Sequence, residues 1–340
     1  MKMLNIYGDA VLFDEDALRF LKPSLGRSWY RDLSGRDLVI AIDMRKAFSG
    51  LINNRAKNLL VWNFWALLLG TLGGINPSFQ DTAGSTVSSR TSGDVSSGAA
   101  YVVFGTSSAT ESFSQYALGS RNTALEGSSI SPTIVEESDK RRLRFGRVSA
   151  GVVSEVGIYQ PVYSSGGGTY TAMWCRKVYS VPGSGYNVYY DIIVKPPFLD
   201  NLVNILFGIM TNSDRTVTKM DGGTITARSS GDVQGAAAYL LIGSSSASFG
   251  FTQYALANPI FLSSAFNYLE SRWTWLMAIL TGATRLTTSY TAAEVGIGQK
   301  IYDTAGYLYD VLLARIVLPT AISRSAGDVF TIAVTFYASG

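Results

Sequence analysis

Short apolar runs alternate with segments rich in Gly, Ser and Thr along most of the chain. Residues 101–104 and 239–242 are continuously apolar, which is typical of short strands buried on both faces. Residues 142–148 alternate between polar and apolar, the pattern of a half-exposed strand. Further β-rich runs occupy residues 173–178, 189–194, 312–317 and 330–336. Residues 272–280 alone could form a helix, but the repeat favours a strand there if a loop has changed length. Many short strands separated by turns predict an antiparallel sandwich or barrel.

Two longer apolar runs each predict a helix. The first covers Asn58–Leu69 and stops at Gly70 and at Gly73-Gly74, and the second covers Asp200–Met210. A membrane-spanning helix needs about 20 apolar residues. Both runs are shorter and contain Asn, so we expect no membrane span here. Each helix is expected to cover one end of a β-core.

The second part of the chain repeats the first. Arg90, Ser92–Val95, Ala99–Tyr101 and Gln115–Leu118 return as Arg228, Ser230–Val233, Ala237–Tyr239 and Gln253–Leu256, with one constant offset in position number (230 − 92 = 138). Glu155–Ile158 returns as Glu294–Ile297 with an offset that is larger by one (294 − 155 = 139). A period this long indicates a duplicated domain, because solenoid and propeller repeats are much shorter.

The repeat predicts the domain organisation. We expect a mainly all-β chain with two tandem antiparallel β-sandwich or jelly-roll-like domains, each opened by a short helix. Residues 57–197 form the first repeat and residues 198–340 the second, with Pro196-Pro197 as a short, stiff linker. Residues 1–56 match neither repeat and are predicted to be an N-terminal arm, either an attachment segment or a solvated subdomain.

Composition narrows the function. Only 16% of the 340 residues are charged, against about 25% in an average soluble protein, so we expect copies of the chain or other partners to cover part of the surface. The chain has no His, the commonest general base and metal ligand. Its single Cys, Cys175, excludes an intrachain disulfide and a Cys-based zinc site. We expect no catalytic residues, no cofactor and no metal.

One basic run could contact nucleic acid. Lys140-Arg141-Arg142 is followed by Arg144 and Arg147, and Phe145 could stack on a base. The second repeat keeps only Arg272 and Arg285 in this region, and the net charge is only +3. We therefore do not expect nucleic acid as a partner. Charged residues that protect a strand edge from aggregation explain the run as well.

The repeated acidic and basic positions predict a structural pairing. Glu155 and Glu294 precede Val-Gly-Ile in both repeats, and Arg176 and Arg315 stand on the strands that follow. We expect Glu155 to pair with Arg176, and Glu294 with Arg315, across neighbouring strands. A salt bridge between subunits is the alternative.

The order of these motifs resembles small domains of phage tail, fibre and neck proteins. The resemblance rests on Asn58–Leu60, Phe104–Ser107, Arg144-Phe145, Glu155–Ile158 and Arg176 in the first repeat, and on Asn201–Val203, Ile242–Ser245, Glu294–Ile297 and Ala314-Arg315 in the second. It implies a non-enzymatic structural protein located in the virion. Its partners would be copies of itself and other virion proteins, arranged around a symmetry axis.

Two other functions stay open, and an enzyme is the least expected class. The chain could be a capsid shell subunit with two jelly-roll domains. It could also be a carbohydrate-binding adhesin that recognises a host-surface glycan through aromatic loops. The aromatic residues that could stack on sugar faces are Tyr163, Tyr170, Tyr302, Tyr307 and Tyr309.

Overall fold

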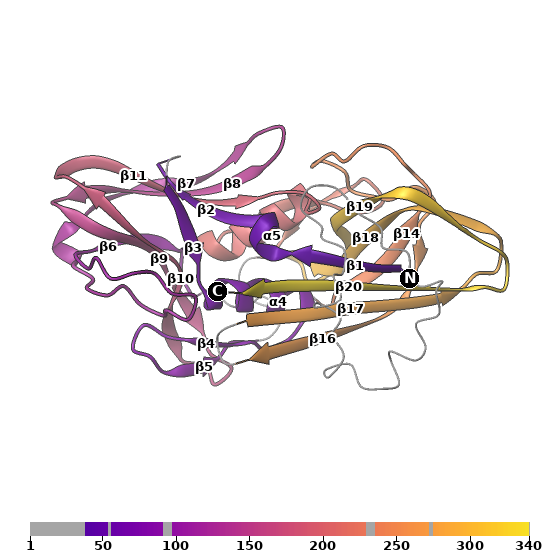
Figure 1. Ribbon diagram of the computed structural model, residues 1–340, viewed down its shortest axis with the longest axis horizontal. Helices are drawn as coiled ribbons and strands as arrows, with labels where there is room; N and C mark the ends of the chain where they lie inside the picture. Colours follow the sequence, from indigo (N-terminus) through magenta and orange to yellow (C-terminus); the bar gives the residue numbers. More distant parts are fainter. Residues whose placement is uncertain (1–37, 54–55, 91–96, 229–234, 272–274, 340) are drawn as a thin grey trace.

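The computed structural model describes residues 38–53, 56–90, 97–228, 235–271 and 275–339, and Figure 1 shows their arrangement. Before the predicted boundary at Pro197, the elements are β1 (Leu38–Asp43), α3 (Met44–Ala47), β2 (Phe48–Ile52), β3 (Ala56–Leu60), α4 (Trp62–Gly73), β4 (Ser78–Gln80), β5 (Thr86–Ser88), β6 (Tyr101–Gly105), η1 (Thr123–Leu125), β7 (Glu126–Glu136), β8 (Arg141–Ala150), β9 (Val153–Tyr163), β10 (Thr169–Val181) and β11 (Ser184–Val194). After it they are α5 (Asp200–Thr211), β12 (Arg215–Thr218), β13 (Thr224–Ala227), β14 (Tyr239–Gly243), β15 (Ile260–Phe261), β16 (Ser263–Ser271), β17 (Trp275–Arg285), β18 (Tyr290–Tyr302), β19 (Leu308–Arg324) and β20 (Val329–Ser339). The predicted all-β class is confirmed.

The sheets on the two sides of the boundary have matching strand orders. In the first half, one sheet runs β6-β9-β10-β3-β2-β11-β8-β7. In the second half, one sheet runs β15-β14-β18-β19. Another runs β20-β17-β16 and is extended at the β20 edge by β1 from the first part of the chain. The series β6-β9-β10 therefore corresponds to β14-β18-β19, and β11-β8-β7 corresponds to β20-β17-β16. Neighbouring strands of the described sheets are antiparallel, apart from the parallel pair β1 and β20.

The helices obey the same spacing, although the predicted start of the first one is wrong. Helix α4 begins at Trp62 and α5 at Asp200, which is the offset of the repeat (200 − 62 = 138), and both contain 12 residues. Asn58–Leu60 lies in β3, because Leu60 pairs with Cys175 of β10. The true counterpart of Asn201 is Asn63. The Asn63 side chain exchanges two hydrogen bonds with the backbone of Gln80. The Asn201 side chain does the same with the backbone of Thr218.

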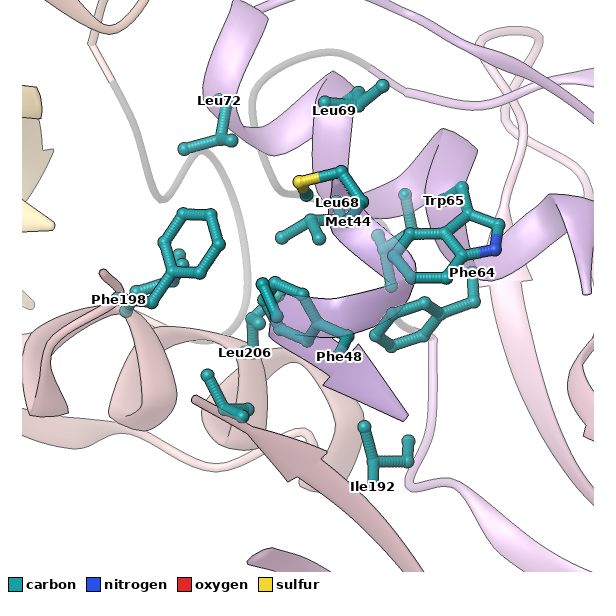
Figure 2. Packing of buried hydrophobic residues seen from close by; sticks show 14 of the residues in the cluster. Met44, Phe48, Phe64, Trp65, Leu68, Leu69, Leu72, Ile192, Phe198 and Leu206 are labelled. Carbon is teal, nitrogen blue, oxygen red and sulfur yellow. The ribbon is translucent and has the colours of Figure 1, made fainter. Parts of the chain in front are cut away.

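Residues 38–53 belong to the sheets, which differs from the predicted arm of residues 1–56. Strand β2 pairs with β11 and β3, and β1 pairs in parallel with β20 of a different sheet. Phe48 of β2 is buried between α4 and the start of α5, with its ring 5.9 Å from Phe64 and 5.0 Å from Phe198 (Figure 2). Residues 1–37 of the predicted arm lie outside the described residues.

The predicted linker at Pro196-Pro197 is also part of the packed structure. The Lys195 amide donates to the Ala47 carbonyl (2.8 Å), and the Arg315 amide donates to the Pro197 carbonyl (2.9 Å). Phe198 forms a β-bridge with Ala314. The segment between the halves therefore continues the sheets instead of acting as a free spacer.

The core is continuous across both halves. A single cluster of buried hydrophobic residues extends from Ile40 to Phe336 and includes residues of α4, α5 and most of the long strands. Figure 1 places α4 and α5 between the sheets of the first half and those of the second. All 12 residues of α4 are buried. This position makes the two helices the centre of the joint between the halves.

Candidate functional site

The structure brings Glu155 and Arg176 together in the first half. Both side chains are fully buried, and Arg176 Nε donates to Glu155 Oε2 at 2.8 Å. Glu155 Oε1 also accepts the amide of Ser120 at 2.7 Å. The other guanidinium nitrogens of Arg176 donate to Gln115 Oε1 (2.9 Å) and to the Ala109 carbonyl (3.0 Å). The pair is internal, and it fixes the loop that follows β6.

The same arrangement recurs in the second half. Arg315 donates through Nε to Glu294 Oε2, and both side chains are buried. Glu294 Oε1 accepts the amide of Ala257 at 2.8 Å, and Arg315 donates to Gln253 Oε1 (3.0 Å) and to the Ala247 carbonyl (2.9 Å). In each half, both charged side chains therefore form hydrogen bonds that hold a loop in place. Burying a charged side chain is costly unless its polar atoms form hydrogen bonds. Here they bond to backbone groups of the loop and to Gln253.

A glycine makes room for each buried carboxylate. A Cβ atom built on Gly105 would lie against Glu155 Oε1 and 2.5 Å from the Ser120 carbonyl. A Cβ atom on Gly243 would lie 2.7 Å from Glu294 Cγ. The last residue of β6 and of β14 is therefore a glycine because the carboxylate occupies the space of a side chain.

We expect Gly105→Ala to lower the free energy of unfolding by about 1–3 kcal/mol, because the new methyl group overpacks this site. Urea denaturation measures the change. The matched control is Gly166→Ala in the turn between β9 and β10, where the nearest atom to an added Cβ is 3.8 Å away. Equal stabilities of the two variants would contradict the assigned role of Gly105.

The two halves exchange hydrogen bonds at the ends of their helices. The amide of Ala100, before β6, donates to the Met210 carbonyl of α5 at 2.6 Å. The amide of Ala238, before β14, donates to the Leu72 carbonyl of α4 at 2.7 Å. The two donors differ by the offset of the repeat, and so do the two acceptors (238 − 100 = 210 − 72 = 138). Each helix therefore ends against the sheet of the other half, as in a two-fold symmetric contact.

A buried glutamine in each half completes this exchange. Gln160 of β9 donates through Nε2 to the Ile209 carbonyl of α5 at 2.8 Å, and to the Gly98 carbonyl at 3.0 Å. Gln299 of β18 donates through Nε2 to the Thr71 carbonyl of α4 at 2.8 Å. Both glutamines are fully buried. We call the contacts of Ala100, Ala238, Gln160 and Gln299 with the opposite helix the reciprocal joint.

Side-chain packing strengthens the reciprocal joint. Phe207 of α5 packs against Phe145 of β8 with ring centroids 6.1 Å apart. Arg141 of β8 forms an ion pair with Asp200 at the start of α5 (2.7 Å), and its guanidinium lies 4.1 Å from the centre of the Phe251 ring. These contacts join the first half to the second through apolar and charged groups together.

The predicted recognition aromatics fall into two groups. Tyr163, Tyr302 and Tyr309 are half-buried, and each has a cation on its ring, from Arg90 (4.6 Å), Arg228 (5.3 Å) and Lys219 (5.1 Å) respectively. Tyr170 is 37% exposed and Tyr307 is 65% exposed. Only the latter two present an open ring, so the structure does not assemble the five residues into one stacking surface.

The basic run is neutralised by carboxylates. Strand β8 lies between β11 and β7, so the interpretation of the run as protection of a strand edge is wrong. Asp191 is fully buried opposite this strand and accepts Arg144 Nε at 2.8 Å. The other pairs are Lys140 with Glu137, Arg142 with Glu137 and Asp191, and Arg147 with Glu126. These pairings account for the charge of the run without a phosphate backbone.

Cys175 is fully buried in β10, and burial raises the pKa of its thiol. Because the thiolate is the reactive form, we expect no labelling by a thiol reagent at pH 8 in the native protein. One thiol per chain is expected to react once urea unfolds it. A colorimetric thiol assay at increasing urea measures this. Rapid labelling without urea would contradict the assigned packing of β10.

In the described part of the chain, no cluster of acidic or Cys side chains is placed to hold a metal ion. None of its helices has the length and apolar character needed to cross a bilayer. Comparison of the chain with protein families gives no match, and comparison with curated proteins and with solved structures gives none either.

Proposed function

We propose that this chain is a non-enzymatic structural subunit of a virion, in a tail, fibre, collar or capsid-associated layer. Two copies of one sandwich unit form its body, and it assembles through hydrophobic and strand-edge contacts without a chemical step. The assignment to a virion depends on the resemblance carried by the ordered sequence motifs.

One observation carries the scaffold role. The buried ion pairs Glu155–Arg176 and Glu294–Arg315 hold loops in place at equivalent positions, and the reciprocal joint fuses the two units into one core. The buried charges of these two ion pairs therefore hold the loops rigidly in place. A rigid double unit with few surface charges suits repeated assembly, because contacts between copies then need little ordering of side chains.

Sedimentation velocity of the purified chain at micromolar concentrations tests the proposal, with electron microscopy of the sedimenting species. We expect a defined oligomer or an ordered array. A monomer at every concentration would contradict the proposal. The copy number in purified particles then separates the subclasses, because hundreds of copies indicate a shell and a dozen or fewer indicate a tail or collar.

A glycan-binding adhesin is the second candidate. Tyr307 and Leu308, at the turn between β18 and β19, are 65% and 41% exposed. An exposed aromatic ring of this kind can stack on a sugar face. A glycan array probed with the purified chain and with Tyr307→Ala tests this function. Binding by the parent chain that Tyr307→Ala loses would favour the adhesin.

A further inference from the structure

One strand pairing of the first half contains a bulge that the second half lacks. Strand β11 pairs with β8, and the flanking pairs are Ser184 with Ala150 and Asn187 with Val148. Three steps along β11 therefore match two steps along β8 (187 − 184 = 3, 150 − 148 = 2), so β11 carries one extra residue here. The corresponding strands of the second half, β20 and β17, keep one register over their whole pairing. The shared sandwich unit therefore does not require the bulge.

The bulge holds an exposed aromatic residue in a fixed position. Tyr186 lies within it and is 52% exposed, and Gly185 before it has a positive φ (81°). Ser149 of β8 is buried beneath the bulge, where its Oγ donates to the Gly183 carbonyl at 2.7 Å and accepts the Tyr186 amide at 3.2 Å. Bulges often re-aim a side chain beside a functional site. The structure thus fixes Tyr186 toward solvent by a device that the framework itself does not need.

Other apolar side chains lie at the same end of the first half. Val152, in the turn between β8 and β9, is 60% exposed, and Pro182, in the turn between β10 and β11, is exposed as well. Leu125 of η1 is half-buried and lies against Gly151, where an added Cβ would be 2.8 Å from its side chain. We call Leu125, Val152, Pro182 and Tyr186 the apolar tip. Figure 1 places the start of β11 at the opposite end of the molecule from the turn between β19 and β20.

The two turns that form the apolar tip contain no charged residue. Residues 148–154 and 178–190 have no Asp, Glu, Lys or Arg. The corresponding turn between β19 and β20 in the second half is flanked by Arg324 and contains Asp328. The absence of charge is therefore a property of this tip and not of the repeated unit.

We propose that the apolar tip inserts into the interface of a lipid bilayer and holds the chain on a membrane surface without spanning it. Tyrosine suits the headgroup level of a bilayer, because its ring is apolar and its hydroxyl stays hydrated. The side chain of Val152 would enter the adjoining acyl region. An uncharged tip inserts without the cost of removing a charge from water. This inference goes beyond the proposed assembly role and does not depend on it.

The size and chemistry of the apolar tip favour a bilayer over a protein or a sugar. A stable protein interface buries about 800 Å² on each partner, whereas this tip consists of two turns with two strongly exposed apolar side chains. A sugar would stack on the Tyr186 ring but would gain little from Val152, the more exposed of the two residues. A bilayer accepts a small protruding tip, because lipids rearrange around it and need no matching shape.

Co-sedimentation with neutral phosphatidylcholine vesicles tests the inference on three forms of the full chain. They are the parent, a tip variant carrying Val152→Ser and Tyr186→Ser, and a control variant carrying Val329→Ser and Tyr307→Ser. The control removes the same residue types elsewhere on the surface, where Val329 is 50% and Tyr307 is 65% exposed. We expect the parent and the control to bind equally and the tip variant to bind about tenfold more weakly. Circular dichroism checks that all three forms are folded.

A fluorescent probe reports insertion directly. Val152→Cys is labelled with an environment-sensitive nitrobenzoxadiazole dye, and Val329→Cys is the control. The native Cys175 is fully buried and should stay unlabelled in the folded chain. On addition of the same vesicles, we expect a blue shift and a brighter emission from the dye at position 152 and no change at position 329.

Three results would overturn the inference. The first is a parent chain that does not bind neutral vesicles, and the second is equal binding by the tip and control variants. The third is binding confined to vesicles that contain phosphatidylglycerol and shared by both variants, because that is adsorption through the net positive charge. Sedimentation velocity without lipid separates these outcomes from the proposed function. Normal assembly of a chain that ignores vesicles would refute the membrane contact alone, and vesicle binding by a chain that stays monomeric would refute the assembly role alone.

Discussion

Glu155→Ala is expected to lower the free energy of unfolding by about 3–5 kcal/mol, because it leaves the buried charge of Arg176 without its partner. The variant also removes the acceptor of the Ser120 amide. Glu294→Ala should have an effect of similar size, since the second half repeats the arrangement. Urea denaturation followed by circular dichroism gives both values.

The control for this prediction is an exposed ion pair of the same charge type. Lys300 and Asp310 lie 3.3 Å apart with side chains 47% and 38% exposed. Pairs in this environment contribute about 0–1 kcal/mol, so Lys300→Ala should be nearly neutral. If Glu155→Ala were as mild as Lys300→Ala, the buried pair would not hold the loop after β6.

The second large effect is expected at the reciprocal joint. Gln160→Leu removes the donor to the Ile209 and Gly98 carbonyls and the acceptor of Trp174 Nε1 (2.8 Å). Each buried polar group left unpaired costs about 1–3 kcal/mol, and the effects do not simply add. We expect a total loss of about 2–4 kcal/mol, again measured in urea. Gln299→Leu should shift stability in the same direction.

Hydrogen exchange distinguishes a role in the joint from a local one. Gln160 stands on β9 of the first half, yet its substitution should also increase exchange in α5 of the second half. Gln299→Leu should in turn increase exchange in α4. Faster exchange confined to the strand that carries each substitution would contradict the reciprocal contact.

The ion pairs could be predicted from the sequence because the repeat marks them. Glu155 and Glu294 precede the same three residues, and Arg176 and Arg315 are separated by the same offset (294 − 155 = 315 − 176 = 139). Adjacent β-runs place them on neighbouring strands, and the observed register puts Arg176 opposite Gly157, two positions from Glu155. The loops that complete each pair carry a repeated signal as well, because Gln115–Leu118 returns as Gln253–Leu256. The two Gln side chains accept hydrogen bonds from Arg176 and Arg315, whereas the backbone atoms that also contribute leave no signal in the sequence.

The start of α4 could not be predicted by pattern. Its N-cap is Val61, which makes no side-chain capping bond, so the sequence lacks the usual start signal. All 12 residues of α4 are buried, so the helix also lacks the polar face that gives a surface helix its period. Its end was indicated by glycine, and Gly74 does adopt the left-handed conformation that closes the helix (φ 60°).

The sequence contains one sign of the reciprocal joint, although the pattern of apolar residues does not indicate it. Gln160 and Gln299 occupy equivalent repeat positions inside largely apolar strands, with the same offset as the two Glu-Val-Gly-Ile motifs (299 − 160 = 139). A repeated polar residue among apolar neighbours indicates a specific buried partner. That the partner belongs to the opposite half depends on how the two halves pack, and sequence spacing does not contain this information.

The central claim is that two copies of one unit share a single core and unfold together. Hydrogen-exchange mass spectrometry at increasing urea tests it most directly, by following peptides from residues 141–163 and 290–302 in the same sample. We expect both peptides to lose protection at one urea concentration, within error. Two separate midpoints, with one half still protected while the other is open, would contradict the claim.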